Sequence, residues 1–198
     1  AEIADLDEHI NGQLAAITTA PPESAIADTV TVGVTGLQAV QRLSAVTGIG
    51  VLTAQIVVAE IGLDMTRFPT AAHLVSWAKL SPRTVQSGAV AQRGRTGKGN
   101  PYLKGALGEA AAVAARTDSF LGERYRRLVK RRGELKALVA TARSLLVIVW
   151  NLLADPSSRY RDLGPDHYAR RTDTQRRVRN HLSQLAALGY RVTVEPAA

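Results

Sequence analysis

Apolar residues recur every three or four positions over most of this chain, which is the spacing that places them on one side of an α-helix. The first such stripe lies beside a row of acidic residues and consists of Ile3, Leu6, Ile10, Leu14 and Ile17. Pro21 and Pro22 end it. Large aliphatic side chains on one stripe need a partner, so we interpret residues 1–20 as the end of a coiled-coil arm and expect a homo-oligomer formed through this helix.

Helical spacing continues from residue 34 to residue 153, where we predict one mainly α-helical domain. The predicted helices cover residues 52–61, 71–79, 101–116, 120–132 and 135–153. The last is the most apolar, so we expect it at the centre of the core, with Leu135 and Val139 on its buried face. We also assign Trp77 and Trp150 to the core. Residues 154–198 form an arginine-rich tail with a predicted helix from 173 to 188, closed by Gly189.

A short glycine motif lies between the first two helical stretches of the domain. Its sequence is Val46-Thr47-Gly48-Ile49-Gly50. The pattern hydrophobic-x-Gly-hydrophobic-Gly is typical of a helix-hairpin-helix. Its glycines permit a tight turn, and the amides that start the next helix can then face a phosphate with the positive end of the helix dipole behind them. An ordinary glycine-rich connection between packed helices has the same pattern, and the sequence leaves both interpretations open.

Composition and charge narrow the class of protein. The 198 residues are 45% apolar, enough for a sizeable core, and they include no cysteine, which excludes disulfides and thiolate metal sites and fits a cytoplasmic location. The longest uncharged apolar run, residues 144–154, is well short of the ~20 residues that span a bilayer, so we expect no membrane partner. Because residue 1 is Ala and the only methionine is Met65, we expect a fragment or a processed product.

Basic residues dominate the middle of the chain. Residues 1–41 carry six acids and no Lys or Arg, whereas the stretch between Met65 and Gly108 carries seven basic residues and no acid. Such a run repels itself unless a polyanion neutralises it, and its glycines let main-chain amides approach phosphate closely. We expect residues 81–100 to form a glycine-rich loop that could include short strands. The predicted nucleic-acid-binding residues are Gly48, Gly50, Arg83, Arg93, Arg95, Lys98, Asn100, Lys104, Arg124, Arg127, Lys130 and Arg131.

Several of these residues have a second interpretation. Asn100 stands directly before Pro101 and would serve equally well as a helix cap. The basic face of helix 120–132 would also be stable if it were only solvated. The four histidines, His9, His73, His167 and His181, are scattered without metal-ligand spacing, so we predict no metal site in this chain.

Motifs along the chain resemble the C-terminal transposase domain of insertion-sequence family 110/116/902. In order they are Val46-Thr47-Gly48-Ile49-Gly50, Thr53-Ala54, Ala59-Glu60-Ile61-Gly62, Arg67-Phe68, Leu80-Ser81-Pro82-Arg83, Gln86-Ser87-Gly88, Gly99-Asn100 and Leu103. The resemblance covers residues 43–153, and Tyr160-Arg161-Asp162-Leu163-Gly164-Pro165-Asp166 and Leu188-Gly189-Tyr190 look like the family's tail. The family usually has Pro where Thr47 stands and Gly where Lys79 stands.

The resemblance implies a recombinase that cuts and rejoins DNA under the guidance of an element-encoded bridge RNA. Such proteins combine a RuvC-like domain, whose four acids bind Mg²⁺, with a domain like this one that carries a nucleophilic serine. Ser87 matches the serine by motif position and would form a phosphoserine ester with DNA, clamped by nearby basic residues. Without the resemblance, a serine before glycine is ordinary turn chemistry. The RuvC-like motifs are absent here, so we expect the isolated chain to be inactive and Mg²⁺ to be bound elsewhere.

Two functions therefore stay open. In one, the chain is the serine-bearing part of a transposase. In the other, it is a non-catalytic module that binds DNA or RNA and oligomerises.

Overall fold

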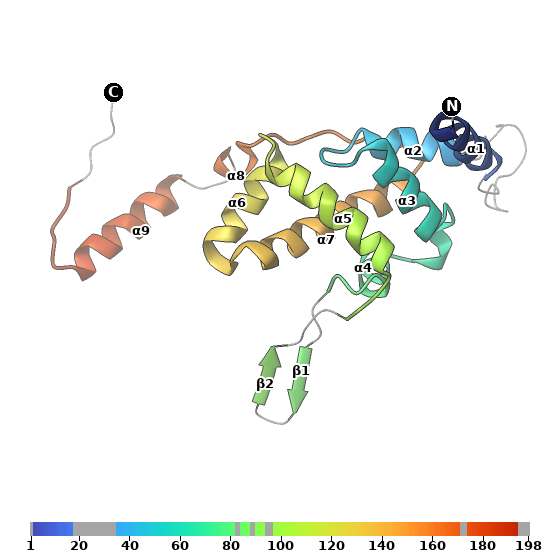
Figure 1. The fold of residues 1–198 in the computed structure, drawn as a ribbon. Coiled ribbons are helices and arrows are strands. Elements are labelled where there is room, and N and C mark those ends of the chain that lie inside the picture. The colour runs from blue at the N-terminus through green and yellow to red at the C-terminus, as the bar shows by residue number, and fades with distance from the viewer. Residues whose placement is uncertain are drawn as a thin grey trace, which may run out of the picture.

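The computed structural model describes residues 2–17, 35–81, 84–87, 90–93, 97–170 and 174–193. The described chain is mainly helical, as predicted. Its helices form one body from which a two-stranded hairpin and the C-terminal helix project in different directions (Figure 1).

Helices α2 (Gly36–Ser44) and α3 (Val51–Ile61) open the body and pack against each other. Thr35 begins α2 with a reciprocal cap, in which its hydroxyl accepts from the Gln38 amide and the Gln38 side chain accepts from the Thr35 amide. Gly62 ends α3. The short 3₁₀ helix η1 (Met65–Arg67) and α4 (Ala71–Trp77) follow, and α4 ends two residues before the predicted boundary at 79.

Helices α5 (Pro101–Ala115), α6 (Phe120–Arg132) and α7 (Glu134–Ala154) complete the body. The predicted bounds of α6 are confirmed, and those of α5 are correct to one residue. Ser119 caps α6 by accepting from the Gly122 amide. Helix α7 packs against α2, α4, α5 and α6, and its side chains at Leu145, Leu146 and Val149 are fully buried. It is the central helix, as its apolar sequence predicts.

The predicted buried face of α7 was wrong at its N-terminal end. Leu135 is 81% exposed and Val139 is 37% exposed, because the side of these first turns that faces the body carries Ala137, which is fully buried. Thr141 is buried instead, and its hydroxyl donates to the Ala137 carbonyl, which satisfies it inside the helix. Trp77 was also wrongly assigned to the core. It is 40% exposed and packs at the surface against the Phe68 ring.

Among the described residues, α7 is the one helix long and apolar enough to cross a membrane by length and composition. A core helix passes the same test, and four other helices of the body pack against α7. We therefore interpret it as the core helix. Trp150 on α7 supports this interpretation, because it is half-buried and donates its indole Nε1–H to the Phe68 carbonyl over 2.8 Å.

Helix α1 (Glu2–Ala16) lies beside α2. The Gly36 amide donates to the Ile17 carbonyl over 2.8 Å, and Leu14 is buried at this contact. The rest of the predicted stripe is less covered, since Leu6 is 60% exposed and Ile17 is 44% exposed. The coiled-coil arm and the self-association expected from this stripe stay predictions.

The chain after α7 runs back over the body before it leaves it. Arg42 of α2 donates its Nη2 to the carbonyls of Asp155 and Ser158 over 2.8 and 2.9 Å and so fastens the start of this segment. The short helix α8 (His167–Arg170) follows, and α9 (Thr174–Ala187) stands apart from the body (Figure 1). Gly189 has a φ of 87°, and the Tyr190 amide bonds the Leu185 carbonyl, so α9 ends with the predicted glycine.

Candidate functional site

Ser87 lies at the end of a strand in the projecting hairpin. Strands β1 (Thr84–Ser87) and β2 (Val90–Arg93) are antiparallel, with Ser87 opposite Val90 in the last pair before the connection. The hairpin extends away from the helices, with Ser87 toward its far end (Figure 1). The stretch expected as a glycine-rich loop that could include short strands is thus a hairpin over these eight residues. Of the other predicted site residues, Arg83 and Arg95 lie outside the described residues, as do the side chains of Ser87 and Arg93.

The return leg of the hairpin is fastened to the body by Lys104. Its ammonium donates to the carbonyls of Gly97 and Lys98 over 2.8 and 3.1 Å. An amine held by two carbonyls of its own loop acts first as a local clamp. The Lys98 side chain, in contrast, is exposed and accessible to a ligand.

Asn100 makes a second attachment at the same place. Its Oδ1 accepts from the Leu103 amide over 3.1 Å, which is the helix-cap role that the sequence left open. Its Nδ2 donates to a carboxylate oxygen of Glu60 on α3. In the sequence, Glu60 is only one residue of the Ala59-Glu60-Ile61-Gly62 motif, 40 positions from Asn100, and the tertiary structure brings this acid to the foot of the hairpin.

The outgoing leg is held by an unusual helix end. Lys79 has a φ of 55°, in the left-handed region that glycine normally occupies, and the Leu80 and Lys79 amides bond the Val75 and Ser76 carbonyls. This is the common glycine-terminated helix end with lysine in the glycine position. Lys79 is also where the resembled family usually has glycine.

The two legs of the hairpin meet directly at this helix end. A Cβ on Gly99 would lie 2.5 Å from the Ala78 carbonyl oxygen and 3.1 Å from the Lys79 Cβ. The main chain just before α5 therefore contacts the main chain at the end of α4. Only glycine, which has no side chain, allows such a close approach. The hairpin therefore rises from a base that is packed on both sides.

The two glycines of the predicted helix-hairpin-helix have different surroundings. Gly48 has a φ of 95°, and a Cβ there would lie 2.4 Å from the Ala110 carbonyl oxygen and 2.8 Å from the Ala114 Cβ, so this residue is needed where the turn packs against α5. Gly50 precedes α3, is exposed, and offers no side-chain cap to the first amides of that helix. A methyl group added at Gly50 would have no neighbouring atom within 4 Å. Of the two, Gly50 has the geometry for an approaching phosphate.

Asp162 connects this turn to α6 and to the C-terminal segment. Its Oδ1 accepts from the amides of Phe120 and Gly164 over 3.1 and 2.6 Å, and its Oδ2 accepts from the Tyr160 hydroxyl over 2.9 Å. The Thr47 hydroxyl is 3.5 Å from the same Oδ2. Burial acts to raise the pKa of Asp162, but these hydrogen bonds outweigh it and lower the pKa below its ordinary value of 3.8. In the sequence, Asp162 stands out only as part of a tail motif.

The basic face predicted on α6 divides into two parts. Arg124 donates its Nη1 to the Tyr168 hydroxyl over 3.2 Å, and the Arg127 guanidinium lies 4.4 Å from the centre of the Tyr168 ring. Lys130 and Arg131 are exposed at the end of the helix. Arg124 and Arg127 therefore stabilise α8 against α6, whereas Lys130 and Arg131 are available to a polyanion.

Metal-binding chemistry has little basis in the described parts of this chain. Across those residues, no group of three or more His, Asp or Glu side chains lies close enough to hold an ion. Carboxylate oxygens are the ligands that Mg²⁺ prefers, so the residues described do not fit a Mg²⁺ site.

Comparisons with known proteins agree with the motifs. The sequence profile of the Transposase IS116/IS110/IS902 family matches residues 40–126, a range that contains the α2–α3 turn, the hairpin and α5. A curated relative, the insertion element IS110 uncharacterized 43.6 kDa protein of Streptomyces coelicolor, is 34% identical over 119 residues. The match covers 57% of this chain and 28% of that protein, so the chain spans little more than a quarter of its relative. Both findings support the transposase family.

Proposed function

We propose that this chain is the serine-bearing C-terminal part of a transposase that cuts and rejoins DNA, with Ser87 as the nucleophile. The observation that carries the proposal is the family match over residues 40–126, which includes the Gln86-Ser87-Gly88 motif. The hairpin is consistent with it, because a nucleophile at the end of a projecting strand can enter an active site whose other groups belong to another domain. In the cell the reaction would take place in the cytoplasm of a bacterium, on DNA chosen by a bridge RNA.

The chemistry assigned to this chain is one transfer step. The Ser87 oxygen would form an ester bond to the scissile phosphorus while the bond from phosphorus to the leaving deoxyribose oxygen breaks. The serine proton would pass to a base outside the described residues, and the leaving oxygen would gain a proton in turn. Basic residues of the same stretch of sequence would stabilise the charge that develops on the phosphate oxygens, typically by a few kcal/mol per donor.

Mg²⁺ belongs to the same proposal but not to these residues. The described residues do not fit a metal site, so the carboxylates that bind Mg²⁺ would come from a RuvC-like domain outside this sequence. No step that we assign to this chain passes through the metal. For the same reason we expect the 198-residue chain alone to leave DNA uncut.

A specific observation also favours the second function, a binding and assembly module. Exposed cationic side chains at Lys98, Lys130 and Arg131 would contact phosphates without any chemistry. Such binding would weaken steeply with salt and show little sequence preference. A filter or fluorescence titration with duplex DNA tests it, and binding that is absent at low salt or insensitive to salt would contradict the nucleic-acid interpretation.

The catalytic proposal is tested in the full-length transposase with its guide RNA, Mg²⁺ and DNA. Ser87→Ala removes only the attacking oxygen, so we expect loss of the covalent protein–DNA adduct on denaturing gels and loss of recombination, with assembly on DNA and RNA unchanged. Ser76→Ala is the matched control, because Ser76 is an exposed serine on α4 outside the hairpin. An adduct that persists in Ser87→Ala would refute Ser87 as the nucleophile.

A further inference from the structure

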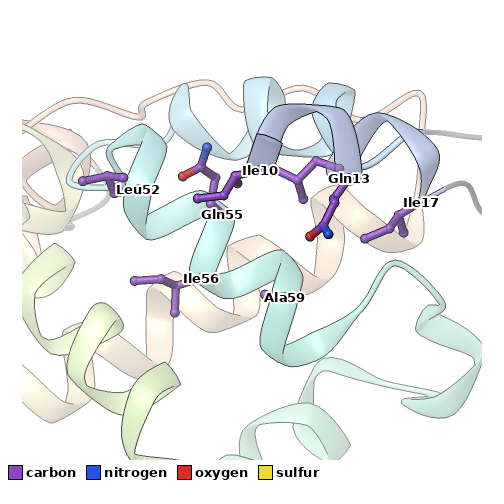
Figure 2. A pocket seen from close by; sticks show the side chains of 8 residues that line it. Ile10, Gln13, Ile17, Leu52, Gln55, Ile56 and Ala59 are labelled. Atoms are coloured by element: carbon purple, nitrogen blue, oxygen red, sulfur yellow. The ribbon is translucent and has the colours of Figure 1, made fainter. Parts of the chain in front are cut away.

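An apolar groove lies between α1 and α3. Its volume is about 480 Å³, and it is lined mainly by Ile10, Leu14, Ile17, Leu52, Ile56 and Ala59. Figure 2 shows lining side chains contributed by both helices, among them Ile10 and Ile17 from α1 and Leu52 and Ile56 from α3. On the α3 side Leu52 is 68% exposed and Ile56 is 40% exposed. Aliphatic side chains gathered at this density on a surface are typical of a protein interaction site.

Helix α1, which forms one side of the groove, has an acidic sequence. Helix α1 carries four acids, at positions 2, 5, 7 and 8, and no lysine or arginine. An occupant of the groove is therefore expected to combine an apolar stripe with positive charge and to lack acids.

Helix α9 of this same chain has that composition. Its 14 residues include three arginines, at 176, 177 and 179, and no acid. Val178, Leu182 and Leu185 follow one another at intervals of four and three residues, the spacing with which an amphipathic helix fills a groove. Val178 is 36% exposed and Leu185 is 37% exposed, whereas Leu182 is half-buried and borders a hollow that it shares with Tyr190 and Val192.

The arrangement of the molecule keeps these two surfaces apart within one chain. Helices α1 and α9 lie at opposite ends of the body (Figure 1). We propose that α9 of one copy binds in the α1–α3 groove of a second copy, with its arginines beside the acids of α1. The contact joins two different surfaces, so it is a head-to-tail interface that closes into a ring or continues as a chain of copies. It does not depend on the proposed transposase activity.

The first test is sedimentation velocity on the nuclease-treated 198-residue protein over a range of concentrations. We expect self-association that Leu52→Asp in the groove and Leu185→Asp in α9 each weaken by at least about tenfold, because each places a charge among apolar side chains. Leu135→Asp is the matched control. Leu135 is more exposed than either residue and lies on α7 outside both surfaces, so this variant should associate like the wild type.

Mixing the two variants separates a head-to-tail contact from the alternatives. The Leu52→Asp protein keeps an intact α9, and the Leu185→Asp protein keeps an intact groove, so an equal mixture should form 1:1 dimers and nothing larger. If the Leu185→Asp protein self-associates as strongly as the wild type, α9 does not take part in the contact, and the proposal is overturned. A wild-type protein that stays monomeric at all concentrations overturns it as well.

Charge exchange tests the choice of α9 as the occupant. Glu8 and Arg179 both have exposed side chains, so their substitution leaves the folded body unchanged. Glu8→Arg or Arg179→Glu alone should weaken association several-fold at low salt, and the double variant should recover part of the loss. A double variant no stronger than the single ones would overturn the pairing of α9 with α1.

Discussion

Gly48→Ala and Gly50→Ala should have different effects on stability, although the two glycines stand two positions apart in one motif. The Gly48→Ala methyl group would meet the main chain of α5 at 2.4 Å, at a φ of 95°. Left-handed backbone costs a non-glycine residue about 1–2 kcal/mol, and overpacking costs about 1–3 kcal/mol, so the free energy of unfolding should fall by about 2–5 kcal/mol.

Gly50→Ala should change the free energy of unfolding by less than about 0.5 kcal/mol. The φ of Gly50 is −84°, and the new methyl would touch nothing within 4 Å. The lower entropy of the unfolded chain stabilises the protein by about 0.4–1 kcal/mol, and the poorer cap at the start of α3 offsets that gain. Urea unfolding followed by circular dichroism measures both variants. A Gly48→Ala protein as stable as the wild type would refute the packing argument.

Substitutions at Gly50 also test whether the turn contacts phosphate. Gly50→Asp should cap α3 and raise the free energy of unfolding by up to about 1 kcal/mol, while its carboxylate repels a phosphate at the helix N-terminus. Gly50→Asn is the matched control, since it caps the helix without charge. If the turn binds DNA, the aspartate variant binds more weakly than the asparagine variant. Equal affinity of the two would contradict the helix-hairpin-helix interpretation.

Side chains elsewhere in the body give three further predictions. Lys79→Gly should raise the free energy of unfolding by about 0.5–1 kcal/mol, because it removes left-handed strain; a decrease in urea unfolding would show that the lysine side chain matters more. Asp162→Asn should lower the free energy of unfolding by about 1–2 kcal/mol at pH 7. Because the folded-state pKa of Asp162 is depressed, its stabilisation is complete above the ordinary value of 3.8 and is lost as pH falls through the lower folded-state pKa, so the variant should lack this acid-dependent loss. If the stability of the Asp162→Asn protein fell with pH as that of the wild type does, this account of Asp162 would be contradicted. Replacing both Lys130 and Arg131 with Glu should leave stability unchanged and reduce the salt dependence of DNA binding by about two phosphate contacts; an unchanged slope would show that this face is only solvated.

Local signals accounted for most of the helical framework. The bounds of α6 followed from its amphipathic spacing, and the start of α5 from Asn100 followed by Pro101. Both signals come from residues that are close together in the sequence, so they can be recognised without the structure. Ser87 was also found in the sequence, from a motif rather than from its surroundings.

Long-range packing decided the rest, because it depends on residues that no local pattern connects. The spacing of α7 predicted Leu135 as buried, yet the buried side of that turn carries Ala137 instead. Gly48 looked like one of two equivalent turn glycines until its contact with α5 distinguished it from Gly50. Helical periodicity reports which side chains could share a face, whereas the position of the neighbouring helix determines which of them lose contact with water.

The candidate site shows the same division. The amino-acid sequence was enough to identify a basic, glycine-rich stretch around Ser87 and the transposase family that it resembles. Only the tertiary structure placed Glu60 beside Asn100, 40 positions apart, and Asp162 beside Thr47, 115 positions apart. Hydrogen bonds between such distant residues form only after the helices have packed, so their partners are set by the folded geometry and leave no periodic trace in the chain.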